Sequence, residues 1–189
     1  YGAFLRVALP LAAPAIAGGH QEWIICSAFG KAGLLGQAIQ AFGDNINRYS
    51  DKLKIKVYHS GELVPGLESL DAVRSGAAQA SYGAPYYWTN VSDAIEFVAT
   101  CPFGMNAMEQ NAWCYYGGGI EEADKIYNAL GLKFLPMGNT GNQMGGWFNK
   151  EINTPADYQG LKMRMPGLGG RTIEKLGATP VLLAGPDVL

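Results

Sequence analysis

Hydrophobic positions in the first half of the chain alternate between two periodicities. One set recurs every three or four residues, as on one face of an amphipathic helix: Leu35, Ile39, Phe42, Ile46 and Tyr49. Directly afterwards, Leu53, Ile55 and Val57 alternate with lysines, which is the period of a half-buried strand. The mostly apolar residues 22–29 predict a further strand before the helix.

The same alternation continues along the chain. Leu67, Leu70 and Val73 predict a second helix between Pro65 and Gly76, and residues 78–82 predict a short strand after it. Strands that alternate with helices require crossover connections. The pattern therefore predicts an α/β sheet.

The second half begins with helical periodicity and ends with short strands. We expect helices at 107–116 and 120–131, and strands at 132–137, 144–149, 161–165 and near 179–185. The polar, turn-prone residues 139–142 separate the first two of these strands. We expect the chain to cross between two lobes there.

Both ends of the chain carry distinctive patterns. Arg6 precedes a short apolar run, and the small residues Ala15 and Ala17 stand at the −3 and −1 positions of a possible cleavage site. This pattern is typical of the end of a secretory signal peptide, the alternative being a plain apolar N-terminal segment. Residues 186–189 resemble the first turn of a helix, so we expect a fragment of a longer protein.

Composition excludes several classes of function. The chain has 189 residues, 48% of them hydrophobic, which is enough for a sizeable core. Its formal net charge of −2 gives no basic surface for nucleic acid and no polybasic patch for membranes. Two histidines and three cysteines leave little material for a His/Cys metal cluster.

Motifs of enzymes are weak. Residues 167–172 begin like a dinucleotide-binding loop, but Thr172 occupies the position of the last glycine. A cysteine nucleophile would need a histidine base, and we expect His59 to be solvated in a turn. Cys101 and Cys114 are either a disulfide pair in an oxidising compartment or small buried thiols.

A binding constellation remains. Arg164 stands between Met163 and Met165 in a predicted strand, and its planar guanidinium suits a carboxylate. The alternative is a salt bridge to an internal Asp or Glu. Gln143, among glycines, could donate to a ligand oxygen or offer its carbonyl oxygen to a hard cation. The aromatic run 86–88, which includes Tyr87 and Trp88, indicates either a pocket wall or core packing.

The chain resembles the solute-binding proteins of tripartite ATP-independent periplasmic (TRAP) transporters, particularly the subgroup for 2-oxo acids and small monocarboxylates. The resemblance covers nearly all of the chain after Ala17. The matching stretches are 64–76 (VPGLESLDAVRSG), 83–88 (GAPYYW), 102–105 (PFGM), 109–119 (EQNAWCYYGGG) and 137–170.

The resemblance implies a two-lobed, type II-like α/β binding protein whose C-terminal part is missing. Residues 1–17 would be a signal-peptide remnant, 18–140 an incomplete first lobe without its return strands, and 141–189 the start of the second lobe. Arg164 would clamp the ligand carboxylate, and Gln143 would lie beside it at a bridging sodium or calcium ion, with no organic cofactor. From the aromatic run itself, we expect Tyr87 and Trp88 also to contact the ligand.

These features imply a periplasmic protein that delivers a small carboxylate, such as pyruvate, to the membrane subunits of a TRAP transporter, driven by an ion gradient. Two other classes remain open: a secreted or periplasmic enzyme acting on small acids, and a ligand-sensing module. An enzyme would need a titratable acid/base pair, which the sequence does not offer.

Overall fold

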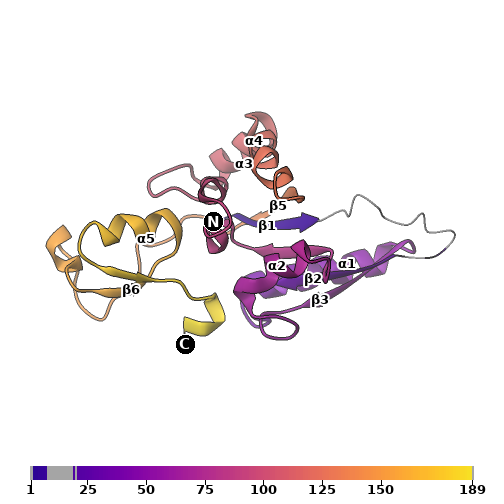
Figure 1. The fold of residues 1–189 in the computed structure, drawn as a ribbon, viewed down its shortest axis with the longest axis horizontal. Coiled ribbons are helices and arrows are strands. Elements are labelled where there is room, and N and C mark those ends of the chain that lie inside the picture. Colours follow the sequence, from indigo (N-terminus) through magenta and orange to yellow (C-terminus); the bar gives the residue numbers. More distant parts are fainter. Residues whose placement is uncertain (1, 8–18, 20, 189) are drawn as a thin grey trace.

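The computed structural model describes residues 2–7, 19 and 21–188. Its larger sheet has five strands in the order β3-β2-β4-β1-β5 (Figure 1). These strands are β1 (Gly2–Val7), β2 (Gln21–Ser27), β3 (Leu53–Tyr58), β4 (Ala80–Gly83) and β5 (Lys133–Asn139). Strands β2, β3 and β4 are parallel, whereas β1 runs antiparallel to both β4 and β5. The predicted α/β fold is confirmed.

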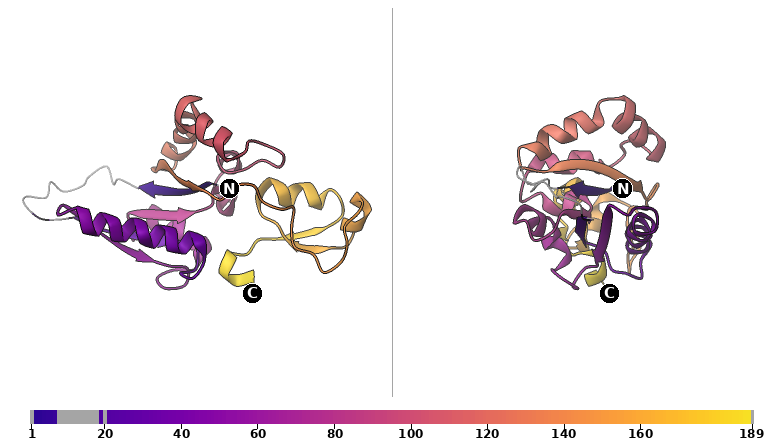
Figure 2. Two further views of the ribbon diagram at one scale, coloured as in Figure 1. Left: turned by 180° about the vertical axis from the view of Figure 1, so that it is seen from behind. Right: turned by 90° about the vertical axis from the view of Figure 1, so that its right-hand side faces the viewer.

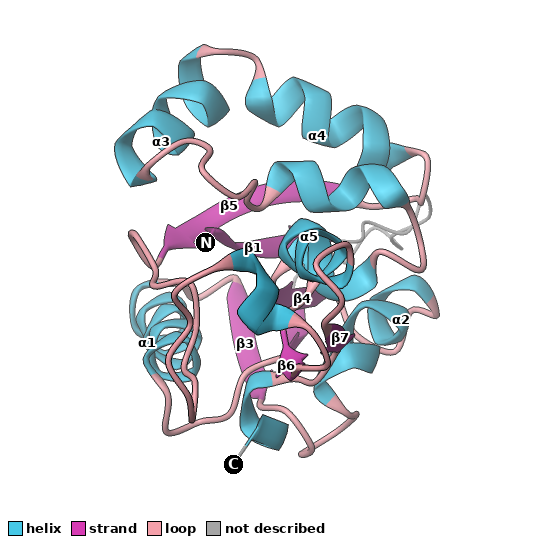
Figure 3. Cartoon of the chain, turned by 90° about the vertical axis from the view of Figure 1, so that its left-hand side faces the viewer, coloured by secondary structure: helices cyan, strands magenta, loops and turns pink. Residues whose placement is uncertain are grey.

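Helices α1 (Leu34–Tyr49) and α2 (Ser69–Arg74) cover opposite faces of this sheet (Figure 3). Successive side chains of a strand point to opposite faces. Accordingly, Ile25 packs with Ile39 of α1, while Cys26 belongs to the cluster around Leu70 of α2. Both helical predictions are confirmed, although the second helix begins with the short 3₁₀ turn η1 (Gly66–Glu68).

Helices α3 (Ala107–Tyr116) and α4 (Gly119–Asn128) lie beyond β5, at the far edge of the sheet (Figure 3). A capping box starts α3: the side chain of Asn106 accepts a hydrogen bond from the backbone N–H of Glu109, and the side chain of Glu109 accepts one from the backbone N–H of Asn106. Tyr127 of α4 stacks on Phe134 of β5, with ring centroids 5.2 Å apart. The five-stranded sheet and these helices form the first lobe.

The second lobe is a smaller βαβ unit. Strands β6 (Lys162–Arg164) and β7 (Thr179–Val181) are parallel and connected through α5 (Gly167–Glu174). The predicted crossing at 139–142 falls at the end of β5, where the chain leaves the larger sheet.

After β7 the chain returns toward the first lobe and ends in the 3₁₀ turn η5 (Gly185–Val188) (Figure 2). Ala184 is fully buried against Gly66, and Pro186 lies against Gly30. The last residues of the predicted second lobe therefore pack on the first.

The strand predicted at 144–149 is wrong, because these residues form an irregular loop. Gly145 and Gly146 weaken extended structure, and Trp147 is 89% exposed, with no sheet face to pack against. The pattern also missed α5 and the 3₁₀ turns η2 (Pro85–Trp88), η3 (Asp93–Val98) and η4 (Pro155–Tyr158).

Part of the predicted signal peptide is strand β1. It pairs with β4 on one side and β5 on the other, so it alone connects β5 to the rest of the described sheet. Residues 8–18 lie outside the described residues. The signal peptide stays a prediction, and cleavage after Ala17 would remove β1 from between β4 and β5.

No helix in the part of the chain that the structure describes is long and apolar enough to cross a membrane. The same part has two hydrophobic clusters, one on each face of the larger sheet. The cluster on the α2 face extends through the aromatic residues of η2 to α4. This packing fixes the loops that follow β2 and β4.

We expect Gly83→Ala to lower the free energy of unfolding of the full-length protein by about 1–3 kcal/mol, the usual cost of overpacking. A Cβ atom at Gly83 would lie 2.5 Å from Cη2 of Trp88 and 3.0 Å from Cβ of Ala28. Urea unfolding measures the change. Gly145→Ala is the control because a Cβ there meets nothing within 4 Å. Equal stabilities of the two variants would contradict this close approach.

Candidate functional site

The candidate site lies at the carboxyl ends of β2 and β4. Strand β2 lies between β3 and β4. The chain passes from β2 to its neighbour β3 on one side and then crosses to β4, its neighbour on the other side. Open α/β sheets bind ligands in the crevice at such a switch point. Phe29 follows β2 directly, and Tyr87 of η2 follows β4.

Three aromatic rings form one wall here. The ring of Phe29 lies 5.4 Å from that of Tyr82 and 6.2 Å from that of Tyr87, between centroids. Tyr82 is almost fully buried, and this desolvation raises its pKa to about 12. The phenol therefore stays neutral at physiological pH, and these rings bring no negative charge to the crevice.

Arg164 reaches this wall from β6 in the second lobe. Its Nη2 donates a hydrogen bond to the hydroxyl of Tyr87 at 3.1 Å. Its Nε and Nη2 also donate to the carbonyl oxygen of Leu183, at 3.2 and 3.0 Å. The guanidinium is thus held by two neutral acceptors, one from the first lobe and one from the segment that returns from β7.

The described residues contain no ion pair of Arg164. Their salt bridges involve Arg74, Lys125, Lys133 and Arg171 instead. The alternative prediction, a bridge to an internal carboxylate, therefore has no counterpart in this part of the chain. A guanidinium carries five N–H donors, and only Nε and Nη2 have protein partners here.

Gln143 lies in the loop between β5 and β6 and is exposed. Its Nε2 donates to the hydroxyl oxygen of Thr140 at 2.9 Å, which fixes the amide and leaves Oε1 as an acceptor. Among the described residues, no direct hydrogen bond joins Gln143 to Arg164 or Tyr87. The fold therefore does not bring the two predicted ligand contacts into one polar network.

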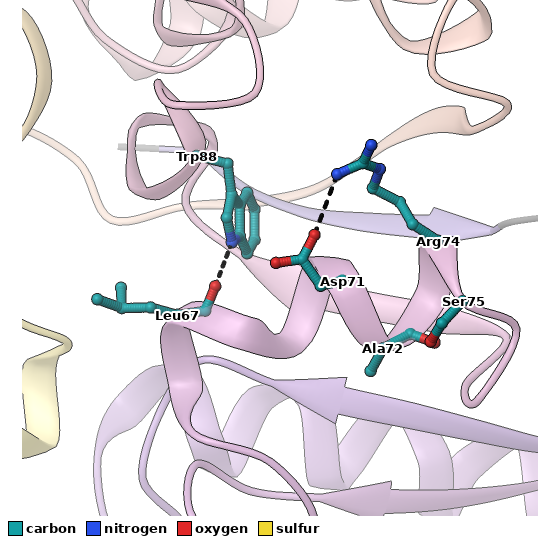
Figure 4. Close-up of polar contacts among 6 residues, drawn as sticks. All are labelled: Leu67, Asp71, Ala72, Arg74, Ser75 and Trp88. Carbon is teal, nitrogen blue, oxygen red and sulfur yellow. Dashed lines mark hydrogen bonds and ion pairs between the residues drawn. The ribbon is translucent and has the colours of Figure 1, made fainter.

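Trp88 faces the interior of the first lobe. Its ring is buried in the core cluster, and its Nε1 donates to the carbonyl oxygen of Leu67 at 2.7 Å (Figure 4). All three residues of the aromatic run are buried, as the packing alternative expected, but Tyr87 also reaches Arg164. Contact between Trp88 and a ligand stays a prediction.

The cysteines form no disulfide: Cys26 and Cys114 are buried free thiols, and Cys101 is an exposed one. Burial raises the pKa of the Cys114 thiol, which disfavours the reactive thiolate. The expectation of a solvated His59 is wrong, because this side chain is buried beside Gln40. No group of three His, Cys, Asp or Glu residues suited to a metal occurs in the described residues.

The sequence patterns did not identify two components of the site. A backbone carbonyl such as that of Leu183 leaves no signal in side-chain patterns. Phe29 has only its position at the carboxyl end of a predicted strand, where α/β sheets carry ligand contacts. Residues 167–172, considered as a nucleotide loop, form most of α5.

Two α/β lobes of unequal size, with an arginine of one meeting the sheet crevice of the other, define the class of two-lobed binding proteins. The sequence model of the bacterial extracellular solute-binding proteins, family 7, matches residues 29–189. The chain belongs to this family.

Individual relatives agree with this assignment. A monocarboxylate 2-oxoacid-binding periplasmic protein from Nostoc sp. is 45% identical over 137 residues, which are 72% of this chain and 38% of that protein. The chain thus spans well under half the length of this curated relative.

Two TRAP periplasmic solute-binding proteins of known structure are also similar. The one from Pseudoalteromonas atlantica, with bound sodium and pyruvate, is 38% identical with a TM-score of 0.85. The one from Colwellia psychrerythraea, with bound calcium and pyruvate, is 40% identical with a TM-score of 0.84. Each comparison covers 89% of this chain and 52% of the other.

We expect Trp88→Phe to lower the free energy of unfolding by about 1–3 kcal/mol, because the partly buried carbonyl of Leu67 loses its donor. Chemical denaturation of the full-length protein measures this change. Trp147→Phe is the matched control, since that ring is exposed. A Trp88 variant as stable as wild type would contradict a packing role.

Proposed function

We propose that this chain is part of an extracytoplasmic solute-binding protein of a TRAP transporter. In this proposal the protein captures a small carboxylate in the periplasm, such as pyruvate or another 2-oxo acid, and delivers it to the membrane subunits. The observation that carries the proposal is the guanidinium of Arg164, held at the sheet crevice without an anionic partner among the described residues.

The charge balance supports an anionic ligand. A cation held only by neutral acceptors keeps its full charge, and enclosing it in a closed crevice is costly unless an anion compensates it. A carboxylate supplies that compensation and accepts parallel hydrogen bonds from the guanidinium fork. The neutral wall of Phe29, Tyr82 and Tyr87 adds no competing negative charge.

Binding explains the residues better than catalysis does. Among the described residues, the candidate site offers an arginine, a phenol and aromatic rings, and no pair of titratable groups for acid/base chemistry is found there. The similarity to relatives with bound pyruvate supports the same ligand class. A ligand-sensing module would use the same crevice and would differ only in the protein that reads the bound state.

The proposal includes a hard cation, because the described residues offer an oxygen atom of the kind that such ions bind. The amide oxygen of Gln143 is a suitable donor for sodium or calcium, and its orientation is fixed through Thr140. Such ions take six or more oxygen ligands, so the bound carboxylate, water and further protein groups would supply the rest.

We expect Arg164→Ala to weaken pyruvate binding by about 2–5 kcal/mol, since the carboxylate loses its charge-assisted hydrogen bonds. Arg164→Lys keeps the charge but loses the fork, so a smaller loss is expected. Isothermal titration of the full-length protein measures both variants. Arg48→Ala, which removes an exposed arginine of α1, is the control.

Thermal melts without ligand separate this clamp from a structural role. Melts close to wild type together with lost binding support the clamp. Lowered melting temperatures with retained affinity in the folded fraction would overturn it.

Removal of cations should weaken pyruvate binding if an ion bridges the carboxylate to Gln143. We expect chelator and sodium-free buffer to raise the dissociation constant, and Gln143→Ala to reproduce that loss and abolish the cation dependence. Gln37→Ala controls for loss of an exposed amide elsewhere. Cation-independent affinity, unchanged in the Gln143 variant, would leave Gln143 a loop residue only.

A further inference from the structure

A second polar contact between the lobes involves charged residues that take no part in the ligand crevice. Arg171 of α5, in the second lobe, faces two acidic residues of η3, in the first. Its Nη2 lies 2.5 Å from Oδ1 of Asp93, and its Nη1 lies 3.5 Å from Oε1 of Glu96. We call Asp93, Glu96 and Arg171 the interlobe cluster.

Glu96 is the buried member of this cluster. Its side chain is 1% exposed, and neither carboxylate oxygen has a hydrogen-bond donor among the described residues. Desolvation raises its pKa, against the opposing effect of Arg171. A carboxylate in this position depends on positive charge from the second lobe, because the described part of the first lobe provides no hydrogen-bond donor to it.

The first turn of α5 approaches the same carboxylate. Gly167 begins α5 with φ +61°, and a Cβ atom there would lie 3.3 Å from Oε2 of Glu96 and 2.9 Å from Cβ of Tyr86. No side chain caps this helix, so the positive end of its dipole is available to an acid. Glycine at 167 therefore permits the close approach of α5 to Glu96.

The two ion pairs of Arg171, with Asp93 and with Glu96, differ in how much they stabilise the contact between the lobes. The side chains of Asp93 and Arg171 are 78% and 52% exposed, and exposed ion pairs of this kind contribute little to stability. Glu96 is desolvated, so removing the charge of Arg171 would leave a buried acid without a compensating charge. The dominant interaction of the cluster is therefore the one between Glu96 and Arg171, supported by the end of α5.

The cluster is close in sequence to the ligand-binding arginine. Only Met165 and Pro166 separate Arg164 from Gly167, so fixing the start of α5 against the first lobe also fixes the end of β6. Arg164 reaches the hydroxyl of Tyr87 in this arrangement. The same arrangement superposes well on relatives that contain pyruvate, with TM-scores of 0.85 and 0.84.

We propose that Glu96 and Arg171, assisted by Asp93, form an interlobe anchor that holds the two lobes in the arrangement in which Arg164 faces the crevice. This inference rests on the proposed function. Glu96 and Arg171 are positioning residues that touch no ligand. The apparent dissociation constant of a binding protein equals its intrinsic value divided by the fraction in the competent arrangement. Loss of the anchor lowers that fraction and weakens binding.

Small-angle X-ray scattering of the ligand-free, full-length protein tests the anchor directly. We expect Glu96→Gln and Arg171→Gln to increase the radius of gyration, because either change removes the charge attraction between the lobes. Arg171→Gln keeps the test interpretable if the buried Glu96 variant folds poorly, since Arg171 is half-exposed. Asp71→Asn is the control, because the ion pair of Asp71 with Arg74 lies within the first lobe.

Isothermal titration with pyruvate supplies the second measurement. Each single variant should raise the dissociation constant about 3- to 30-fold, and the double variant should be no weaker than the weaker single variant, since both act through one contact. Wild-type scattering of both ligand-free variants, or effects on affinity that simply add, would overturn the anchor. Failure of the wild-type protein to bind pyruvate or any other small carboxylate would overturn the proposed function, while the scattering still tests the anchor.

Discussion

The arrangement of the candidate site depends on the guanidinium of Arg164, which hydrogen-bonds to neutral groups and has no acidic partner among the described residues. Arg164 donates to the hydroxyl of Tyr87 and to the carbonyl of Leu183, and both acceptors are neutral. These groups come from different segments, so the guanidinium joins the second lobe, the first lobe and the segment returning between them. In the proposed function, its remaining charge would favour an anionic ligand.

The sheet order determines where that cation meets the first lobe. Because the connections that follow β2 and β4 run to opposite sides of the sheet, their carboxyl ends form a switch point, where Phe29 and Tyr87 lie in ring contact. The glycine at 83 allows the indole of Trp88 to pack directly against the end of β4. This close packing holds η2, and with it Tyr87, on a rigid part of the fold.

The two lobes meet through contacts of opposite chemical character. At the crevice a positive side chain lies among neutral groups, whereas at η3 the buried acid Glu96 faces Arg171 and the start of α5. An uncompensated charge at an interface favours any arrangement or ligand that places an opposite charge beside it. The second contact satisfies this requirement within the protein, whereas in the proposed function a bound carboxylate would satisfy the first.

The sequence by itself determined the elements whose stability is local. Helix α1 follows from its apolar spacing, and residues 164 and 143 stand out by side-chain chemistry alone. It failed for residues 144–149 because a short apolar run becomes a strand only where a partner strand exists. Tertiary structure alone decided that, among the described residues, Arg164 has no acidic partner and Gln143 makes no direct hydrogen bond to it. Both outcomes depend on contacts between segments far apart in sequence, such as Arg164 with Tyr87, which no local pattern encodes.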